Sequence, residues 1–123
     1  MNAVLYDSEL KVMECLWEMG TVHASDLVPV MEERVGWNKN TTYTIVKKLV
    51  AKGYVERIEP RFQCRALVTR EEVEKAHTSE LVEKLYGGST KMFLSAFVKN
   101  HDLDKSDIDE LRSLIDAWDE GMT

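Results

Sequence analysis

The sequence predicts a mainly α-helical protein with one small β-hairpin, and three observations lead to this prediction. Apolar residues recur at helical spacing in three short segments of the first half of the chain. An alternating apolar and polar segment with a turn follows them, as is typical of a hairpin. Helical spacing then returns over residues 71–123. We therefore expect a domain of helices and a hairpin over residues 1–70, followed by a helical domain over residues 71–123.

The first two helices are predicted from their apolar spacing and their end signals. The first begins near Asp7 or Ser8, because either side chain can accept a hydrogen bond from the free amides, and it ends at Gly20 in a left-handed turn. The second runs from about Ala24 to Arg34. It contains Pro29, which removes one helical hydrogen bond and favours a kink or a later start.

The third helix has the most informative pair of faces. We expect Asn40 to cap it and Gly53 to follow its last residue. At 100° per residue, the residues that lie on one face and are expected in the core are Thr42, Ile45, Val46 and Leu49. The residues on the opposite face are Asn40, Tyr43, Thr44 and Lys47. The amide, phenol, hydroxyl and ammonium of the second face are groups that bond DNA base edges and phosphates.

A β-hairpin is predicted directly after the third helix. Residues 54–58 alternate as a strand does, residues 59–61 form the turn, and residues 62–68 return as a second strand. Three helices followed by a hairpin are the winged-helix arrangement, in which the hairpin is the wing. Arg57, Arg61 and Arg65 lie on or beside this hairpin, where they suit contact with the DNA backbone or minor groove.

The distribution of charge favours a polyanionic partner, although the whole chain carries a net charge of −6. Residues 34–70 hold nine Lys and Arg against Glu56 and Glu59, a net charge of +7, whereas the segments on either side are acidic. A partner responds to the local potential, so this block predicts a DNA-binding surface. Two alternatives stay open, namely a solvated basic face without a partner and an adaptor surface that docks an acidic protein.

Residues 71–123 are predicted to form a dimerisation domain. A capping box of Thr69 and Glu72 opens a helix that ends before Gly87, residues 92–98 are apolar at six of seven positions, and Ser106–Asp109 resembles a further helix start. Three short helices cannot hide this much apolar surface among themselves, and two-fold dimers are the commonest solution. The alternative is one monomeric core with residues 1–70. The residues expected at the dimer interface are Leu81, Leu85, Met92, Phe93, Phe97, Ile108, Leu111, Leu114, Ile115 and Trp118.

Other functional classes have little support in the sequence. The chain has no nucleophile-elbow motif, its Gly87–Lys91 segment lacks the P-loop spacing, and its histidines lack zinc-ligand spacing, so we expect no catalytic residue, metal or cofactor. No segment is long and apolar enough to span a membrane, and no signal peptide is evident. We expect Cys15 and Cys64 to be buried thiols in a cytoplasmic protein and His77 to lie at an interface or to be half-buried.

Three sequence segments together resemble one family. They are LYDSELKVMECLWEMGTVHASDLV, WNKNTTYTIVKKLVAKGYVER and LVTREE, and they cover nearly the whole chain in the family's order. In these segments the chain is similar to the penicillinase and methicillin-resistance repressors (the BlaI/MecI family), to which the copper-responsive repressors are related. The resemblance implies an N-terminal winged helix, a C-terminal helical dimerisation domain and repression by a homodimer on a palindromic operator.

The resemblance also implies roles for particular residues. Asn40, Thr41, Tyr43 and Thr44 match family residues that approach DNA, with Tyr43 standing where lysine or arginine is frequent. Beside them, we expect Lys39, Lys47, Lys48 and Arg61 to neutralise phosphates, with Arg57 and Arg65 contributing less. Replacing Tyr43 should change operator preference, whereas replacing Lys47 should weaken all sequences about equally.

Release of the operator by proteolysis is a further implication of the resemblance. A membrane-bound antibiotic sensor triggers cleavage in the family, and the matching bond here joins Ala96 to Phe97, with alanine where better-known members have asparagine. The paired Cys-x-Cys motifs of copper repressors are absent after Cys64. The alternative regulator class is one that responds to a metal or to a small molecule held near Met92, Phe93 and Phe97.

Overall fold

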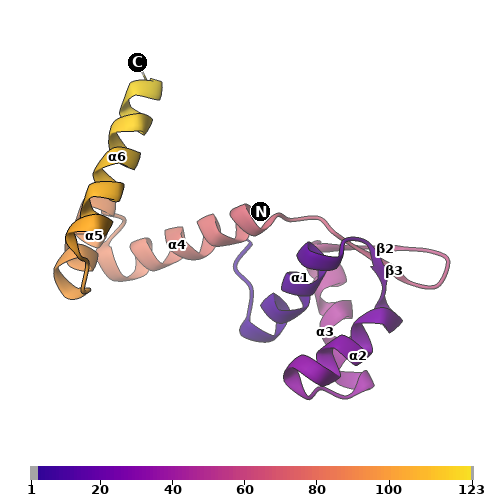
Figure 1. Ribbon diagram of the computed structural model, residues 1–123. Helices are drawn as coiled ribbons and strands as arrows, with labels where there is room; N and C mark the ends of the chain where they lie inside the picture. The colour runs from indigo at the N-terminus through magenta and orange to yellow at the C-terminus, as the bar shows by residue number, and fades with distance from the viewer. Residues whose placement is uncertain (1–2, 123) are drawn as a thin grey trace. The chain divides into compact units, whose positions relative to one another are not determined.

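A computed structural model describes residues 3–122, and it confirms the expected mainly helical fold with a small sheet (Figure 1). Residues up to Leu81 form one compact unit and residues from Val82 form a second. The sequence placed its domain boundary at residue 70, where helix α4 begins, whereas the two units divide inside α4. The elements are α1 (Asp7–Met19), β1 (Val22–His23), α2 (Ala24–Val35), α3 (Lys39–Lys52), β2 (Val55–Ile58), β3 (Gln63–Ala66), α4 (Arg70–Tyr86), α5 (Thr90–Asn100) and α6 (Lys105–Met122).

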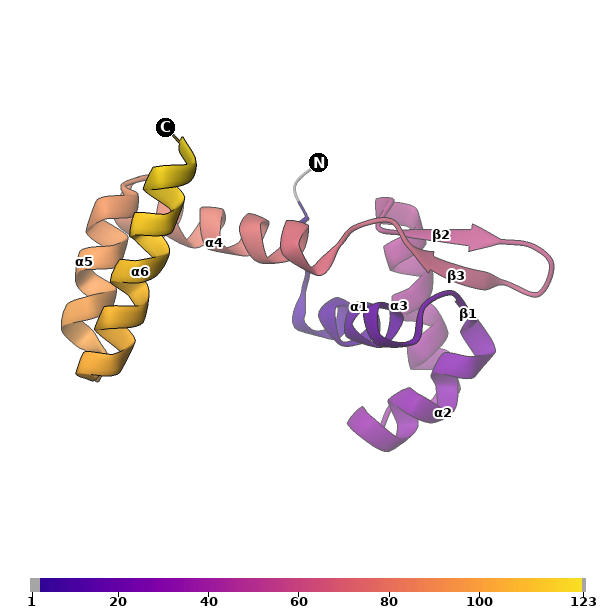
Figure 2. The same cartoon turned by 45° about the horizontal axis from the view of Figure 1, so that its top comes forward.

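The sheet of the first unit has three antiparallel strands in the order β1-β3-β2 (Figure 2). In the hairpin, Val55 pairs with Ala66 and Ile58 pairs with Gln63. The two-residue strand β1 was not predicted; it pairs with β3 through Val22 opposite Cys64. This pairing, together with a 2.9 Å hydrogen bond from the Ala24 N–H to the Phe62 carbonyl, ties the turn end of β3 to the start of α2.

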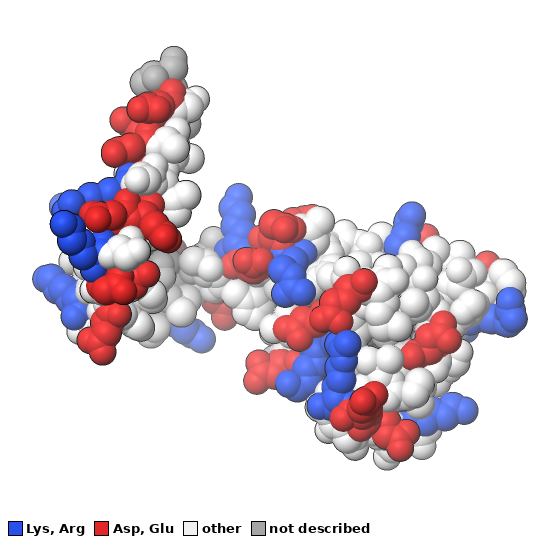
Figure 3. All heavy atoms as spheres, viewed as in Figure 1, with Lys and Arg blue, Asp and Glu red and all other residues white. Residues whose placement is uncertain are grey.

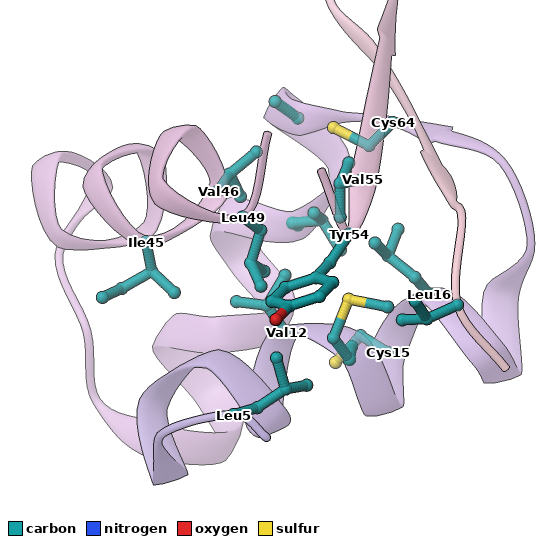
Figure 4. Close-up of a cluster of buried hydrophobic side chains, with 14 of the residues drawn as sticks. Leu5, Val12, Cys15, Leu16, Ile45, Val46, Leu49, Tyr54, Val55 and Cys64 are labelled. Carbon is teal, nitrogen blue, oxygen red and sulfur yellow. The ribbon is translucent and has the colours of Figure 1, made fainter. Parts of the chain in front are cut away.

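The core of the first unit is built from the inward faces of α1, α2 and α3 and from the strands (Figure 4). As the apolar spacing predicts, α3 buries Thr42, Ile45, Val46 and Leu49. Both cysteines are buried thiols, as expected. The other fully buried large side chains include Val12, Met13, Leu27, Met31 and Val55. Because one face of α3 is held in this core, its opposite face is directed away from the core.

Several helix ends differ from the sequence prediction. Asn38, not Asn40, caps α3: its Oδ1 accepts a 2.8 Å hydrogen bond from the Thr41 N–H. Both asparagines are chemically able to cap, and the apolar spacing does not define the first turn. Gly20 ends α1 at φ 80° and ψ −157°, a positive-φ conformation outside the predicted left-handed helical region. Helix α2 continues through Pro29 to Val35.

The predicted start of α4 agrees with the structure, whereas the predicted start of α6 does not. The Thr69 capping box is confirmed, because the Glu72 N–H donates to Thr69 Oγ at 3.1 Å and the Thr69 N–H donates to Glu72 Oε1 at 3.4 Å. The helix start predicted within Ser106–Asp109 is wrong. The helix begins at Lys105, and Asp104 Oδ1 accepts a 2.8 Å hydrogen bond from the Asp107 N–H. Asp107 therefore belongs to the first turn, and its Oδ2 accepts a 3.3 Å hydrogen bond from the Asp104 N–H.

Candidate nucleic-acid interface

The outward face of α3 exposes the polar groups that the helical spacing selected. Asn40, Thr44 and Lys47 are exposed, and Thr41 and Tyr43 are half-buried. The Thr44 hydroxyl donates to the Asn40 carbonyl at 2.8 Å, so its oxygen lone pairs stay available as acceptors. In the part of the chain that the structure describes, the Tyr43 hydroxyl has no hydrogen-bond partner. This face can therefore offer amide, hydroxyl and ammonium groups to a ligand.

The wing turn is organised by one carboxylate. Glu59 Oε1 lies 2.6 Å from Arg57 Nε, and Glu59 Oε2 accepts a 3.4 Å hydrogen bond from the Phe62 N–H. The hydrogen bond from Arg57, assisted by the Phe62 N–H, holds the pKa of Glu59 below its usual value. Arg61 and Phe62 both adopt the left-handed region, at φ 62° and 50°. With the turn held in this way, the Arg61 side chain is exposed at its tip.

An aromatic contact joins the wing to α3. The rings of Phe62 and Tyr43 meet edge to face, with 6.0 Å between centroids and 69° between planes. The Arg57 guanidinium lies over the Phe62 ring, 3.8 Å from its centroid, and Lys39 Nζ lies 6.0 Å from the centroid of Tyr43. Neither Glu59 nor Phe62 was among the sequence candidates. The two-residue spacing of Arg57 and Glu59 was the available signal, since such residues share one side of an extended segment.

The basic block divides into paired and unpaired side chains. Four of its cations form ion pairs: Lys52 with Glu9, Arg34 with Glu18, Arg57 with Glu59, and Arg65 with Glu56. Arg70 lies over the Trp17 ring, 4.8 Å from its centroid. Figure 3 shows Lys and Arg side chains at the free end of the hairpin. Among residues 3–122, no carboxylate forms an ion pair with Lys39, Lys47, Lys48 or Arg61, which are the four side chains expected to contact phosphates.

A comparison with protein families identifies the chain. The family model described as penicillinase repressor matches residues 5–117. The chain belongs to the penicillinase repressor family. This family comprises transcriptional repressors and not enzymes.

Individual proteins are also similar to this family member over most of its length. An uncharacterized 16.5 kDa protein of Latilactobacillus sakei is 31% identical over 112 residues, which are 89% of this chain and 77% of that protein. The methicillin resistance regulatory protein MecI of Staphylococcus aureus is 24% identical and aligns over 88% of this chain and 89% of its own length. The penicillinase repressor of Staphylococcus aureus is also 24% identical, with 88% and 87% covered.

A solved structure supports the winged-helix fold of this family member. The solution structure of the DNA binding domain of the repressor BlaI matches with a TM-score of 0.54 and 18% sequence identity. The match covers 58% of this chain and 90% of that domain. The expected mainly helical fold with a β wing is therefore confirmed by a structure as well as by the family.

The residues expected at the dimer interface of this family member are largely uncovered in a single chain. In the second unit, Leu85, Leu114 and Trp118 are each 67% exposed, and α5 buries no residue. Leu81, Met92, Phe97, Leu111 and Ile115 are exposed as well, while Phe93 and Ile108 are half-buried. Phe93 lies between Tyr86 and Phe97, with ring centroids 5.6 and 6.2 Å away. Most side chains of the apolar run of α5 are thus exposed in a single chain, and their burial in a dimer stays a prediction.

His77 and the two cysteines occupy structural positions in the first unit. His77 is half-buried, as expected, and its Nε2 accepts a 3.0 Å hydrogen bond from the Leu5 N–H. Burial raises the pKa of the Cys64 thiol to about 11. Among the described residues, no group of His, Cys, Asp and Glu side chains is arranged to hold a metal ion. Nor does any helix within residues 3–122 combine the length and apolar character required to cross a membrane.

Proposed function

We propose that this protein is a transcriptional repressor that binds a palindromic DNA operator as a homodimer. The observation that carries the proposal is the exposed polar face of α3, which is flanked by four basic side chains without carboxylate partners among the described residues. Phosphates attract such cations, while base edges require the neutral donors and acceptors between them. Membership of the penicillinase repressor family supports the same function.

The residues of this surface divide into two roles. Asn40, Thr41, Tyr43 and Thr44 line the major groove and contact base edges or the thymine methyl group. Lys39, Lys47 and Lys48 on α3 and Arg61 on the wing neutralise phosphates, and these contacts set the position of the helix in the groove. Arg57 and Arg65 contribute less to affinity, because their guanidinium groups are already paired with Glu59 and Glu56.

A homodimer suits both the exposed apolar side chains and a symmetric operator. The second unit exposes Leu85, Leu114, Ile115 and Trp118, whose burial against a second copy removes apolar surface from water. Two copies related by a two-fold axis then present two α3 helices to successive major grooves, about 34–36 Å apart along the duplex. This pairing raises affinity without new contacts within each protomer, because the second helix binds at high effective concentration.

Proteolysis provides a route to release of the operator. The Ala96–Phe97 bond lies inside α5, and its cleavage separates α6 from the rest of the chain. The apolar side chains of Leu111, Leu114, Ile115 and Trp118 are then lost from the dimer interface. We propose that a membrane-bound sensor protease causes this cleavage directly or through a second protease.

Binding of the full chain to duplex DNA tests the proposed function. Fluorescence anisotropy with labelled DNA from upstream of its own gene, at physiological salt and with excess unrelated duplex, should show saturable binding. Footprinting should then show two protected half-sites of related sequence. Equal affinity for the upstream and unrelated duplexes, or no binding to either, contradicts the proposal. Binding to acidic proteins in place of DNA would favour the adaptor alternative.

A further inference from the structure

Phe62 is a half-buried side chain of the wing that contacts α3. It belongs neither to the polar face of α3 nor to the proposed phosphate contacts, so its role is still to be explained. Its position is fixed from three directions. The Phe62 carbonyl accepts a 2.9 Å hydrogen bond from the Ala24 N–H at the start of α2, and the Phe62 N–H donates to Glu59 Oε2 at 3.4 Å. The Arg57 guanidinium covers the ring at 3.8 Å from its centroid. The two backbone hydrogen bonds hold the main chain of Phe62 and the guanidinium restricts its ring, so the ring can act as a fixed stop for a neighbouring side chain.

The neighbouring side chain is Tyr43. Its ring meets Phe62 edge to face at 6.0 Å, which is within the preferred range for aromatic pairs. Lys39 Nζ, 6.0 Å from the Tyr43 centroid, approaches the same ring. One part of the Tyr43 ring is therefore packed, while its hydroxyl has no hydrogen-bond partner in the described part of the chain. Packing of this kind restricts the side-chain torsions and with them the position of the hydroxyl.

We infer that Phe62 is a positioning residue that fixes the orientation of the Tyr43 ring and thereby determines which base Tyr43 selects. This inference rests on the proposed DNA-binding function and extends it to the wing. The wing then contributes to base selection without touching the base, and Arg57 supports Phe62 by lying over its ring. Sequence readout by a side chain depends on such support, because a polar group that moves by about 1 Å loses its hydrogen-bond geometry.

The test measures base preference, which a loss of overall affinity does not change. Full-length variants are used to select duplexes from a randomised DNA library, and sequencing of the bound fraction gives the preference at each position. Tyr43→Ala identifies the positions that depend on Tyr43. Phe62→Leu should lower preference at those same positions by roughly three- to tenfold, the size expected from loss of an aromatic pair. Phe62→Tyr, which keeps the ring, should retain the original preference.

Two further variants separate positioning from general stability. Arg57→Gln removes the cation over Phe62, and Arg65→Gln removes an equally paired arginine of the same hairpin for which no contact with Phe62 is described. Arg57→Gln should weaken the Tyr43-dependent preference, and Arg65→Gln should leave it unchanged. Because Arg57 is exposed, this comparison holds even where Phe62→Leu unfolds the wing. The double variant Tyr43→Ala with Phe62→Leu should have the same profile as Tyr43→Ala alone.

Two results would overturn the inference while leaving the proposed function intact. One is an equal loss of affinity for all sequences in Phe62→Leu, with the preference unchanged. The other is a change of preference in the double variant that equals the sum of the two single changes, since independent side chains give additive effects. By contrast, a wild-type chain that selects no sequence from the library would overturn the proposed function itself, and the inference with it.

Discussion

The ammonium of Lys52, at the end of α3, lies 2.7 Å from the carboxylate of Glu9 in α1, which is only 1% exposed. The other Glu9 oxygen, Oε1, accepts a 2.9 Å hydrogen bond from the Tyr6 N–H. Lys52 also lies over the Tyr6 ring, 4.6 Å from its centroid. The hydrogen bond to Glu9 raises the pKa of Lys52. Although Lys52 belongs to the basic block, it therefore serves the fold of the first unit.

Replacing the two members of this ion pair should have unequal effects on stability. Lys52→Met leaves a buried carboxylate without its cation, whereas Glu9→Gln leaves a half-exposed ammonium that water can solvate. We expect Lys52→Met to lower the melting temperature by several degrees and Glu9→Gln to lower it less. Thermal unfolding at pH 7, followed by circular dichroism, measures both. An equal or larger loss in Glu9→Gln would show that the carboxylate is not held by Lys52.

The division of the basic block predicts the salt dependence of DNA binding. In the proposed dimer, the four cations of each protomer that have no carboxylate partner among residues 3–122 give a slope of log affinity against log salt of about −7. Lys47→Gln should reduce the slope by about 2 in the dimer, one contact at each half-site, and should weaken all sequences about equally. Anisotropy titrations at several salt concentrations measure the slope.

Lys52→Met is the control for this measurement. It removes the same charge from the same helix, but from a cation already paired with Glu9. We expect the slope of the folded variant to be unchanged at a temperature well below its unfolding transition. A similar fall in slope for Lys47→Gln and Lys52→Met would mean that the two lysines contact DNA alike, contrary to the assignment.

The sequence predicts the faces of α3 well because burial repeats along a helix. Thr42, Ile45, Val46 and Leu49 are four positions of one stripe, so an error in the starting residue does not change which face is buried. The cap is a single residue, and Asn38 and Asn40 have the same side chain. Only the 2.8 Å bond to the Thr41 N–H distinguishes them. Helix faces are thus predictable where helix ends are not.

The organisation of the wing could not be predicted in the same way. Glu59 contacts Arg57 and the Phe62 N–H because the turn folds back, and Phe62 meets Tyr43 only after the hairpin packs beside α3. Strand β1 has two residues, too few for an alternating pattern to be visible. The Tyr43–Phe62 contact and the pairing of β1 with β3 join residues distant in sequence, so local propensity and periodicity do not encode them, whereas the contacts of Glu59 depend on the conformation of the turn. The candidate site was therefore predicted by residue type, while its internal support required the three-dimensional arrangement.

Trp118, in α6, is the best position for a test of the proposed homodimer. It is 67% exposed in a single chain and lies on the apolar stripe with Ile108, Leu111, Leu114 and Ile115. Trp118→Glu places a charge in the proposed interface, where burial without a partner is unfavourable. We expect the dimer dissociation constant to rise by at least about thirtyfold, since large aromatic anchors commonly contribute about 2 kcal/mol or more. Sedimentation equilibrium over a range of concentrations gives the dissociation constant.

A charge change on the other side of α6 controls for effects of charge alone. Asp116 is exposed and lies opposite the apolar stripe at 100° per residue. Asp116→Lys changes the charge by more than Trp118→Glu does, yet it should leave the dissociation constant nearly unchanged. Should Trp118→Glu remain as dimeric as the wild type, the interface must be formed by other residues.

The thiol of Cys64 should make the fold sensitive to alkaline pH. Its pKa is about 11 in the folded protein, against 9.0 when unshifted, so between these values the unfolded chain binds fewer protons than the folded one. Stability therefore falls as pH rises through this window, by about 2 kcal/mol in total for this group. Urea unfolding at pH 8 and pH 11 measures the loss.

Cys64→Ala separates this contribution from the others that act at high pH. Burial also raises the pKa of Cys15, and the hydrogen bond to Glu9 raises that of Lys52, so both still reduce stability at alkaline pH in the variant. We expect Cys64→Ala to be less stable than the wild type at pH 8 but to lose less between pH 8 and pH 11. The same loss in both proteins would assign the alkaline sensitivity to other groups.

The proposed cleavage site lies in regular helix, which determines when a protease can use it. Ala96 and Phe97 are in the interior of α5, and Phe97 stacks on His101 with ring centroids 4.1 Å apart. A protease binds an extended segment, so α5 must open locally before the bond is cut. Ala96→Pro removes a helical hydrogen bond and should increase cleavage by an added nonspecific protease.

Under derepressing conditions in cells, mass spectrometry of the wild-type chain should show a new C-terminus at Ala96. Phe97→Ala should suppress that product if the protease selects the aromatic side chain, and an intact wild-type chain under derepression would contradict release by proteolysis.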